Sequence, residues 1–197
     1  MEKRYFFQKA LDRYFYVYLV IGFLSIFDIV TRNNFESFAT TIQTICLVLV
    51  LVYSWNLYNV SGNKKMKILF FTQLLTIGVS FSTFVLFPSL LNTAYMVTLS
   101  LLIIYIIINL VQIYLSLSFF KEEIATIKIK SLYPVILIIS IITMITELIV
   151  TTIYSPLGAL GSSSTICSIV YIYYLYVCRS ELKLDSRIDT STLNNDN

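Results

Sequence analysis

Apolar residues along this chain gather into six long runs that are separated by short polar stretches. The runs cover residues 11–30, 38–58, 67–87, 94–119, 132–154 and 157–178. Because a helix rises about 1.5 Å per residue, each run is long enough to cross about 30 Å of hydrocarbon. Inside a bilayer the backbone hydrogen bonds must be made within the protein, which favours helices over open strands. The pattern therefore predicts an all-α integral membrane protein, a bundle of about six transmembrane helices with short outer loops.

The composition supports this prediction. Of the 197 residues, 57% are hydrophobic and 13% are charged, whereas soluble domains carry about 25% charged residues. Six spans of about 20 residues use most of the chain, so a folded domain outside the membrane has no room. We expect a cytoplasmic N-terminal segment (1–10), a six-helix transmembrane domain (11–180) and a polar, disordered cytoplasmic tail (181–197).

Basic residues fall almost entirely on one side of this six-span arrangement. That side contains both termini and the second and fourth connections, and it holds every Lys and Arg except Arg32. Because basic residues accumulate in cytoplasmic loops, we expect both termini in the cytoplasm. Tyrosines at the start of the first span and the end of the last lie at the same interface, where we expect them to act as anchors. The richness in Ile, Tyr, Phe, Asn and Lys suggests a bacterial inner membrane protein.

Several kinds of chemistry lack the residues that they need. The chain has no histidine, no closely spaced cysteine pair and no glycine-rich phosphate loop. We therefore expect no enzymatic activity, no cofactor and no metal site. Cys46, Cys167 and Cys178 lie within or at the end of expected spans, and their odd number predicts buried free thiols.

Polar side chains within the spans are candidates for function, because their burial in a bilayer is costly. The candidates are Glu147 and Thr143 in the fifth span, Asn109 and Gln112 in the fourth, and Gln73 in the third. Two interpretations of Glu147 remain open. Its carboxyl group either makes a packing hydrogen bond or lines a polar pathway together with the other four side chains.

Other residues have structural interpretations. Asp28 and Arg32 are four residues apart at the outer end of the first span, a spacing that allows them to pair as a cap. Gly161, Ser164 and Ser168 are small residues of the sixth span, where they permit close helix packing.

These observations lead to two functional hypotheses. The first is a non-enzymatic conduit, transport-type or pore-forming protein with a polar interior, in which a wider conduit requires a homo-oligomer. The second is an accessory or regulatory membrane subunit that binds a cytoplasmic protein through the basic inner loops, such as a bacterial stress- or phage-defence component. The lipid bilayer is the expected partner in both. Nucleic-acid binding is not supported, since topology alone explains the basic residues.

Overall fold

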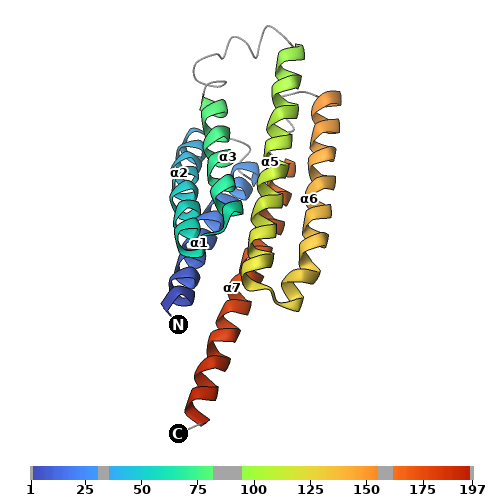
Figure 1. The fold of residues 1–197 in the computed structure, drawn as a ribbon. Helices are drawn as coiled ribbons and strands as arrows, with labels where there is room; N and C mark the ends of the chain where they lie inside the picture. The colour runs from blue at the N-terminus through green and yellow to red at the C-terminus, as the bar shows by residue number, and fades with distance from the viewer. Residues whose placement is uncertain (1, 31–35, 82–94, 155–161, 196–197) are drawn as a thin grey trace.

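The chain folds into helices wherever its structure is described. The structure is a computed structural model that describes residues 2–30, 36–81, 95–154 and 162–195. These ranges form α1 (Glu2–Val30), α2 (Glu36–Ser61), α3 (Lys64–Phe81), α5 (Tyr95–Ile124), α6 (Ile127–Tyr154) and α7 (Ser162–Asn195), shown in Figure 1. The described ranges contain no strand. The all-α fold is therefore confirmed, and each apolar run lies largely within one helix.

Four of the helices are long and apolar enough to cross a membrane. The qualifying segments are Lys3–Phe27 of α1, Thr44–Ser61 of α2, Ile103–Ile124 of α5 and Ile127–Thr146 of α6. The described part of α3 has 18 residues, with lysines at three of its first four positions. The apolar first half of α7 continues into a charged second half. Membrane-spanning helices are thus supported for four of the six.

The helices are arranged as a ring. Each helix packs against its neighbours in the chain, and α7 closes the ring by packing against α1, while α5 and α7 also touch. One end of the bundle carries the start of α1, the α2–α3 turn and the α5–α6 turn (Figure 1). We call this end the basic end, since lysines flank both turns. The largest fully buried side chains, which include Leu11, Tyr14, Phe119 and Tyr174, lie in the half of the bundle nearest to it.

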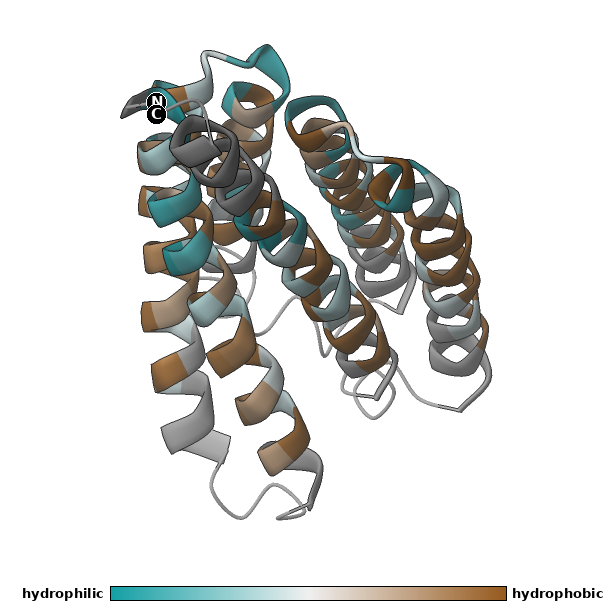
Figure 2. Cartoon of the chain, turned by 90° about the horizontal axis from the view of Figure 1, so that it is seen from below, coloured by the Kyte–Doolittle hydropathy of each residue, from teal (hydrophilic) through white to brown (hydrophobic). Residues whose placement is uncertain are grey.

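Large apolar side chains also cover the outside of the bundle. Phe23 is 64% exposed, and Leu75, Ile107 and Ile142 are also more than half exposed. Figure 2, which is seen from the basic end, shows hydrophilic residues gathered there and hydrophobic ones along the helices. Contiguous apolar surface of this extent is unfavourable in water, whereas lipid tails accommodate it.

The two described turns each contain one residue with a positive φ. Gly62, with φ +74°, ends α2, and its N–H donates a hydrogen bond of 2.7 Å to the Tyr58 carbonyl oxygen. Ala125, with φ +55°, ends α5. Glycine adopts this left-handed conformation readily, whereas a Cβ makes it unfavourable by about 1–2 kcal/mol. The α2–α3 turn therefore has the favourable residue and the α5–α6 turn does not.

Exchanging glycine and alanine at these turns should change stability in opposite directions. Gly62→Ala should lower the free energy of unfolding by about 1 kcal/mol, since a Cβ there meets no atom within 4 Å and only the backbone conformation is strained. Ala125→Gly should raise the free energy of unfolding by about 0.5–1 kcal/mol. Relief of the backbone strain stabilises the folded protein, and the greater freedom that glycine gives the unfolded chain offsets only part of this gain. Denaturant titration of the detergent-solubilised protein measures both values. Changes of the same sign would contradict this account.

The C-terminal tail departs from its expected disorder. Residues 181–195 continue α7 as helix, and Figure 1 shows α7 running past the ends of the other helices. A helix that is already nucleated extends by adding one hydrogen bond per residue, so polarity alone does not end it. Leu182 adds a contact, since it is buried against the core. The tail is thus polar, as expected, but helical through Asn195.

Candidate functional site

Polar side chains from five helices meet inside the bundle. They are Tyr14 and Tyr18 of α1, Ser54 of α2, Gln73 of α3, Ser116 of α5 and Tyr171 of α7, which we call the central network. All except the partly buried Tyr18 are buried. Their surroundings are the apolar side chains of the main core. The central network is therefore a polar region enclosed by apolar packing.

Hydrogen bonds join the central network from one side of the ring to the other. The Ser54 hydroxyl donates to Gln73 Oε1 over 2.8 Å, and Gln73 also interacts with the Tyr18 hydroxyl. The Tyr14 hydroxyl lies 3.4 Å from the Tyr18 hydroxyl and 3.3 Å from the Tyr171 hydroxyl. Tyr171 in turn shares a hydrogen bond with the Ser116 hydroxyl. The six side chains thus form one continuous chain of contacts.

A close approach of α1 and α7 brings the tyrosines together. Tyr14 and Tyr18 are four residues apart, so they lie on the same face of α1. One turn further along, a Cβ on Gly22 would overlap the tip of the Ile172 side chain. Glycine at this position allows α7 to pack near enough for the Tyr18 and Tyr171 rings to meet edge to face, with centroids 4.8 Å apart.

Aromatic rings fill the bundle between the central network and the basic end. The Phe119 ring lies 4.9 Å from the Phe120 ring and 6.0 Å from the Phe7 ring, and Phe120 lies 6.2 Å from Tyr14, all between centroids. Phe119 and Phe120 are fully buried. We call Phe7, Phe119 and Phe120 the aromatic layer. It packs α1 against α5 on this side of the network.

The central network consists only of neutral hydroxyl and amide groups. Its hydroxyl groups can donate or accept by rotating, so their hydrogen bonds can be redirected without moving the backbone. Among the described residues, no three His, Cys, Asp or Glu side chains come together as a metal site. The chemistry available to this group is therefore the exchange of hydrogen-bond partners.

The structure places the expected pathway residues in different surroundings. Gln73 belongs to the central network, and Gln112 Nε2 donates to Thr76 Oγ1 over 2.7 Å, one turn further along α3. Asn109 and Thr143 instead donate to carbonyl oxygens four residues earlier in their own helices. Glu147 is a residue of α6 whose side chain lies outside the described part of the structure. Gln73 and Gln112 are thus the two that share the α3–α5 region.

The expected structural residues lie mostly outside the described part. Ser168 is partly buried in α7, whereas the side chain of Ser164, in the same helix, is not described, nor is Gly161. Asp28 is a residue of α1 without a described side chain, and Arg32 falls in the undescribed segment 31–35. The proposed cap pair and the packing role of Gly161 and Ser164 therefore stay predictions. Cys46, Cys167 and Cys178 are buried, and none of the three is in a disulfide bond, as expected.

Of the central network, sequence reasoning selects only Gln73 as a candidate site residue. The anchoring interpretation of the tyrosines is wrong for Tyr14, Tyr171 and Tyr174, which are buried inside the bundle, whereas Tyr16 and Tyr173 are exposed. The helical period separates the two kinds, because Tyr14 lies three residues after the fully buried Leu11 and Tyr16 lies on another face. This period was the signal that could have identified the buried tyrosines.

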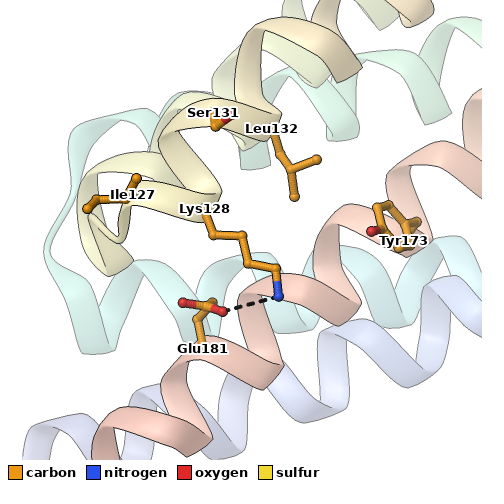
Figure 3. A pocket seen from close by; sticks show the side chains of 6 residues that line it. All are labelled: Ile127, Lys128, Ser131, Leu132, Tyr173 and Glu181. Atoms are coloured by element: carbon orange, nitrogen blue, oxygen red, sulfur yellow. Dashed lines mark ion pairs between the residues drawn. The ribbon is translucent and has the colours of Figure 1, made fainter.

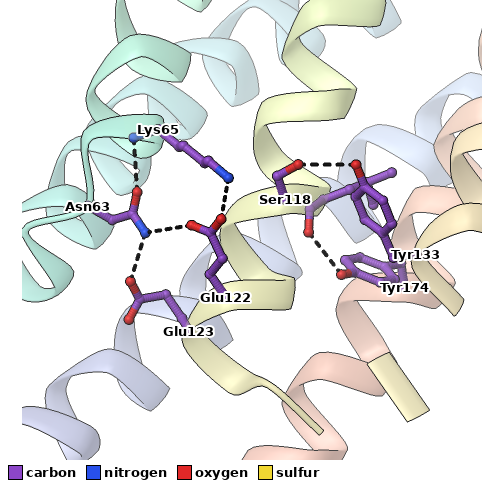
Figure 4. Close-up of polar contacts among 8 residues, drawn as sticks. Asn63, Lys65, Ser118, Glu122, Glu123, Tyr133 and Tyr174 are labelled. Atoms are coloured by element: carbon purple, nitrogen blue, oxygen red, sulfur yellow. Dashed lines mark hydrogen bonds and ion pairs between the residues drawn. The ribbon is translucent and has the colours of Figure 1, made fainter. Parts of the chain in front are cut away.

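Charged side chains join neighbouring helices at the basic end. Lys65 forms an ion pair with Glu122, and Asn63 Nδ2 donates to Glu123 Oε1 over 3.0 Å, which links the α2–α3 turn to α5 (Figure 4). On the other side of α5, the Tyr174 hydroxyl donates to the Leu117 carbonyl oxygen over 3.1 Å. These contacts hold α3, α5 and α7 together beside the aromatic layer.

Arg179 makes a corresponding link between α7 and α1. Its guanidinium group forms an ion pair with Asp12 and donates a 2.8 Å hydrogen bond to the Tyr16 hydroxyl. Burial lowers the pKa of Arg179, but the hydrogen bonds to Asp12 and Tyr16 outweigh it and raise this pKa above its ordinary value. The group therefore stays charged, and the link persists at physiological pH.

Known proteins add no information about this site. Comparison of the chain with protein-family models, curated proteins and solved structures finds no match.

Proposed function

We propose that this chain is a non-enzymatic transport-type protein of a bacterial inner membrane, built from six transmembrane helices with both termini in the cytoplasm. The topology is supported by the basic end, where lysines flank both described turns and the chain begins. Basic residues favour the cytoplasmic side. The apolar runs that include α3 and the first half of α7 supply the two spans beyond the four long apolar helices.

The observation that carries the proposal is the convergence of polar side chains from five helices on the central network. Pairs of polar residues are enough to join membrane helices, and each such hydrogen bond contributes only about 0.6 kcal/mol. A continuous chain of polar side chains across the ring contains more polar groups than are needed to join neighbouring helices in pairs. The central network offers hydrogen-bond partners to a polar solute that leaves water. A solute that passes through an apolar bundle needs such partners to replace its hydrogen bonds with water.

The central network favours a small uncharged polar solute. None of its six side chains is ionisable as an acid or base near neutral pH, so it supplies no fixed charge to balance an ion. In the described conformation the buried rings of the aromatic layer lie between the central network and the basic end. Passage therefore requires a second conformation in which these rings move. A wider conduit would require several copies of the chain around an axis.

Solute flux in proteoliposomes tests the proposal. Vesicles that contain the purified chain should swell faster than empty vesicles in iso-osmotic glycerol or urea, as measured by light scattering. Insertion is checked in cells with an Asn63→Cys variant in a background without native cysteines, which should resist labelling from outside. Flux equal to that of empty vesicles, with correct insertion, would contradict the transport proposal.

A second candidate is an accessory or regulatory subunit that uses the bundle as an anchor. The observation that favours it is the helical end of α7, which runs past the other helices and carries the exposed Leu184 (Figure 1). A protein partner at the basic end could bind this helix. Removal of residues 184–197 separates the two hypotheses, since it should leave solute flux unchanged and abolish binding of such a partner.

A further inference from the structure

An open groove lies between α6 and α7 at the basic end. Its volume is about 690 Å³, and it is lined by Ile127, Lys128, Ser131, Leu132, Tyr173 and Glu181 (Figure 3). The groove is separate from the central network, and none of the network residues lines it. It therefore offers a place for a ligand that does not enter the bundle.

The groove holds one positive and one negative charge close together. Lys128 Nζ lies 3.5 Å from Glu181 Oε1, and Figure 3 shows the two side chains reaching toward each other from α6 and α7. The Lys128 side chain is 58% exposed, so it can move toward a ligand, whereas that of Glu181 is 16% exposed. An ammonium group has three donors and a carboxylate has about four acceptor sites. Each group can therefore bind a ligand while the ion pair between them is kept.

The polarity of the groove changes along the direction of the helices. Lys128 and Glu181 lie nearest the basic end, whereas Leu132 is one turn further along α6 and Tyr173 two turns earlier in α7. Ile127, at the first position of α6, is 87% exposed. In the proposed topology the charged pair and Ile127 lie at the cytoplasmic interface, and Leu132 and Tyr173 lie at the level of the acyl chains. This is the order of polarity in a phospholipid.

We propose that this groove binds the headgroup of a phospholipid with a primary amine, of the phosphatidylethanolamine type. The lipid phosphate accepts hydrogen bonds from Lys128 and the Ser131 hydroxyl, and the lipid ammonium group donates to Glu181. The acyl chains lie along Leu132 and Tyr173. The inference requires membrane insertion in the proposed orientation but no transport activity.

Charge complementarity selects this lipid class over others. A zwitterionic headgroup matches one lysine beside one glutamate, whereas a purely anionic headgroup would bring negative charge to Glu181. A quaternary choline group carries positive charge but has no N–H to donate to the carboxylate. A primary amine supplies up to three such donors, and hydrogen bonds between charged groups are the strong ones.

Binding of short-chain lipids to the purified full chain tests the inference. Dioctanoyl phosphatidylethanolamine should bind at least tenfold more tightly than the corresponding phosphatidylcholine or phosphatidylglycerol, as measured by native mass spectrometry in detergent. Glu181→Gln should abolish the preference for ethanolamine over choline. Lys128→Gln should weaken the binding of both zwitterionic lipids. The matched control is Lys130→Gln, which alters an exposed lysine at the same end outside the groove and should change each affinity less than twofold.

A variant with the two charges exchanged controls for the possibility that the single substitutions lose lipid binding because they disturb the fold. The double variant Lys128→Glu, Glu181→Lys keeps an ion pair between α6 and α7 but reverses its order, so it should fold with an unchanged melting temperature and lose the preference for ethanolamine. Equal binding of ethanolamine and choline lipids by the wild type would overturn the inference. Retention of the preference by Glu181→Gln would also overturn it, as would strongest binding of phosphatidylglycerol. None of these results depends on solute flux, so failure here is distinct from failure of the transport proposal.

Discussion

Replacing Phe119 by alanine should lower the free energy of unfolding by about 3 kcal/mol, near the lower end of the range for buried phenylalanines. The side chain is fully buried, and its ring contacts Phe120 and Phe7 in the aromatic layer. In a bilayer the gain from removing apolar surface from water is small, but the cavity left by the ring still forfeits its packing contacts. We therefore expect a large loss at this position.

The matched control for this variant is Phe23→Ala. Phe23 lies on the outer surface of α1, so its removal should change stability by less than about 0.5 kcal/mol. Denaturant titration in detergent micelles compares the two. Equal losses would show that the aromatic layer is not a tightly packed region. In proteoliposomes Phe119→Ala should also raise solute leakage, because it removes part of the closure beside the central network. Unchanged leakage would exclude this layer as the barrier.

The positions of the helices could be predicted from the sequence, because the bilayer leaves the backbone few alternatives. The six apolar runs indicated where α1, α2, α3, α5, α6 and α7 lie. The run at 157–178 did not reveal that α7 continues through Asn195. Helix propagation beyond a membrane depends on local backbone hydrogen bonds, and apolar runs do not report these.

The central network could be predicted only in part. Gln73 is a predictable member, because a buried amide in a span is costly. Ser116 shares a helix face with Asn109 and Gln112, but small polar residues are common at helix interfaces, and nothing in its own span distinguishes Ser54. Tyr14 and Tyr171 lie near the ends of their spans, a position that predicts the membrane interface. Which helices are neighbours in the ring is a property of tertiary packing, and the period within one helix identifies a face but not the helix that covers it.

Replacing Gln73 by methionine should separate the stability of the central network from its function. Gln73 accepts a hydrogen bond from Ser54, and methionine keeps its length without its amide. The variant leaves the Ser54 hydroxyl without this partner, which should cost about 1–2 kcal/mol. Ser54→Ala should cost a similar amount. In the double variant both polar groups are absent and no unpaired group stays buried, so its loss of stability should be smaller than that of either single variant.

Flux distinguishes the two roles of these residues. If the central network carries a polar solute, flux should fall in Gln73→Met and stay low in the double variant, although the double variant recovers stability. The matched control is Ser118→Ala, since Ser118 is also buried and shares a 3.3 Å hydrogen bond with Tyr133 outside the network. That variant should lose a similar amount of stability and keep its flux. Recovery of flux together with stability in the double variant would show that Gln73 joins helices and does not contact the solute. The second apolar substitution removes the unpaired hydroxyl group and so repairs a packing defect. It does not restore a hydrogen-bond partner that the solute has lost.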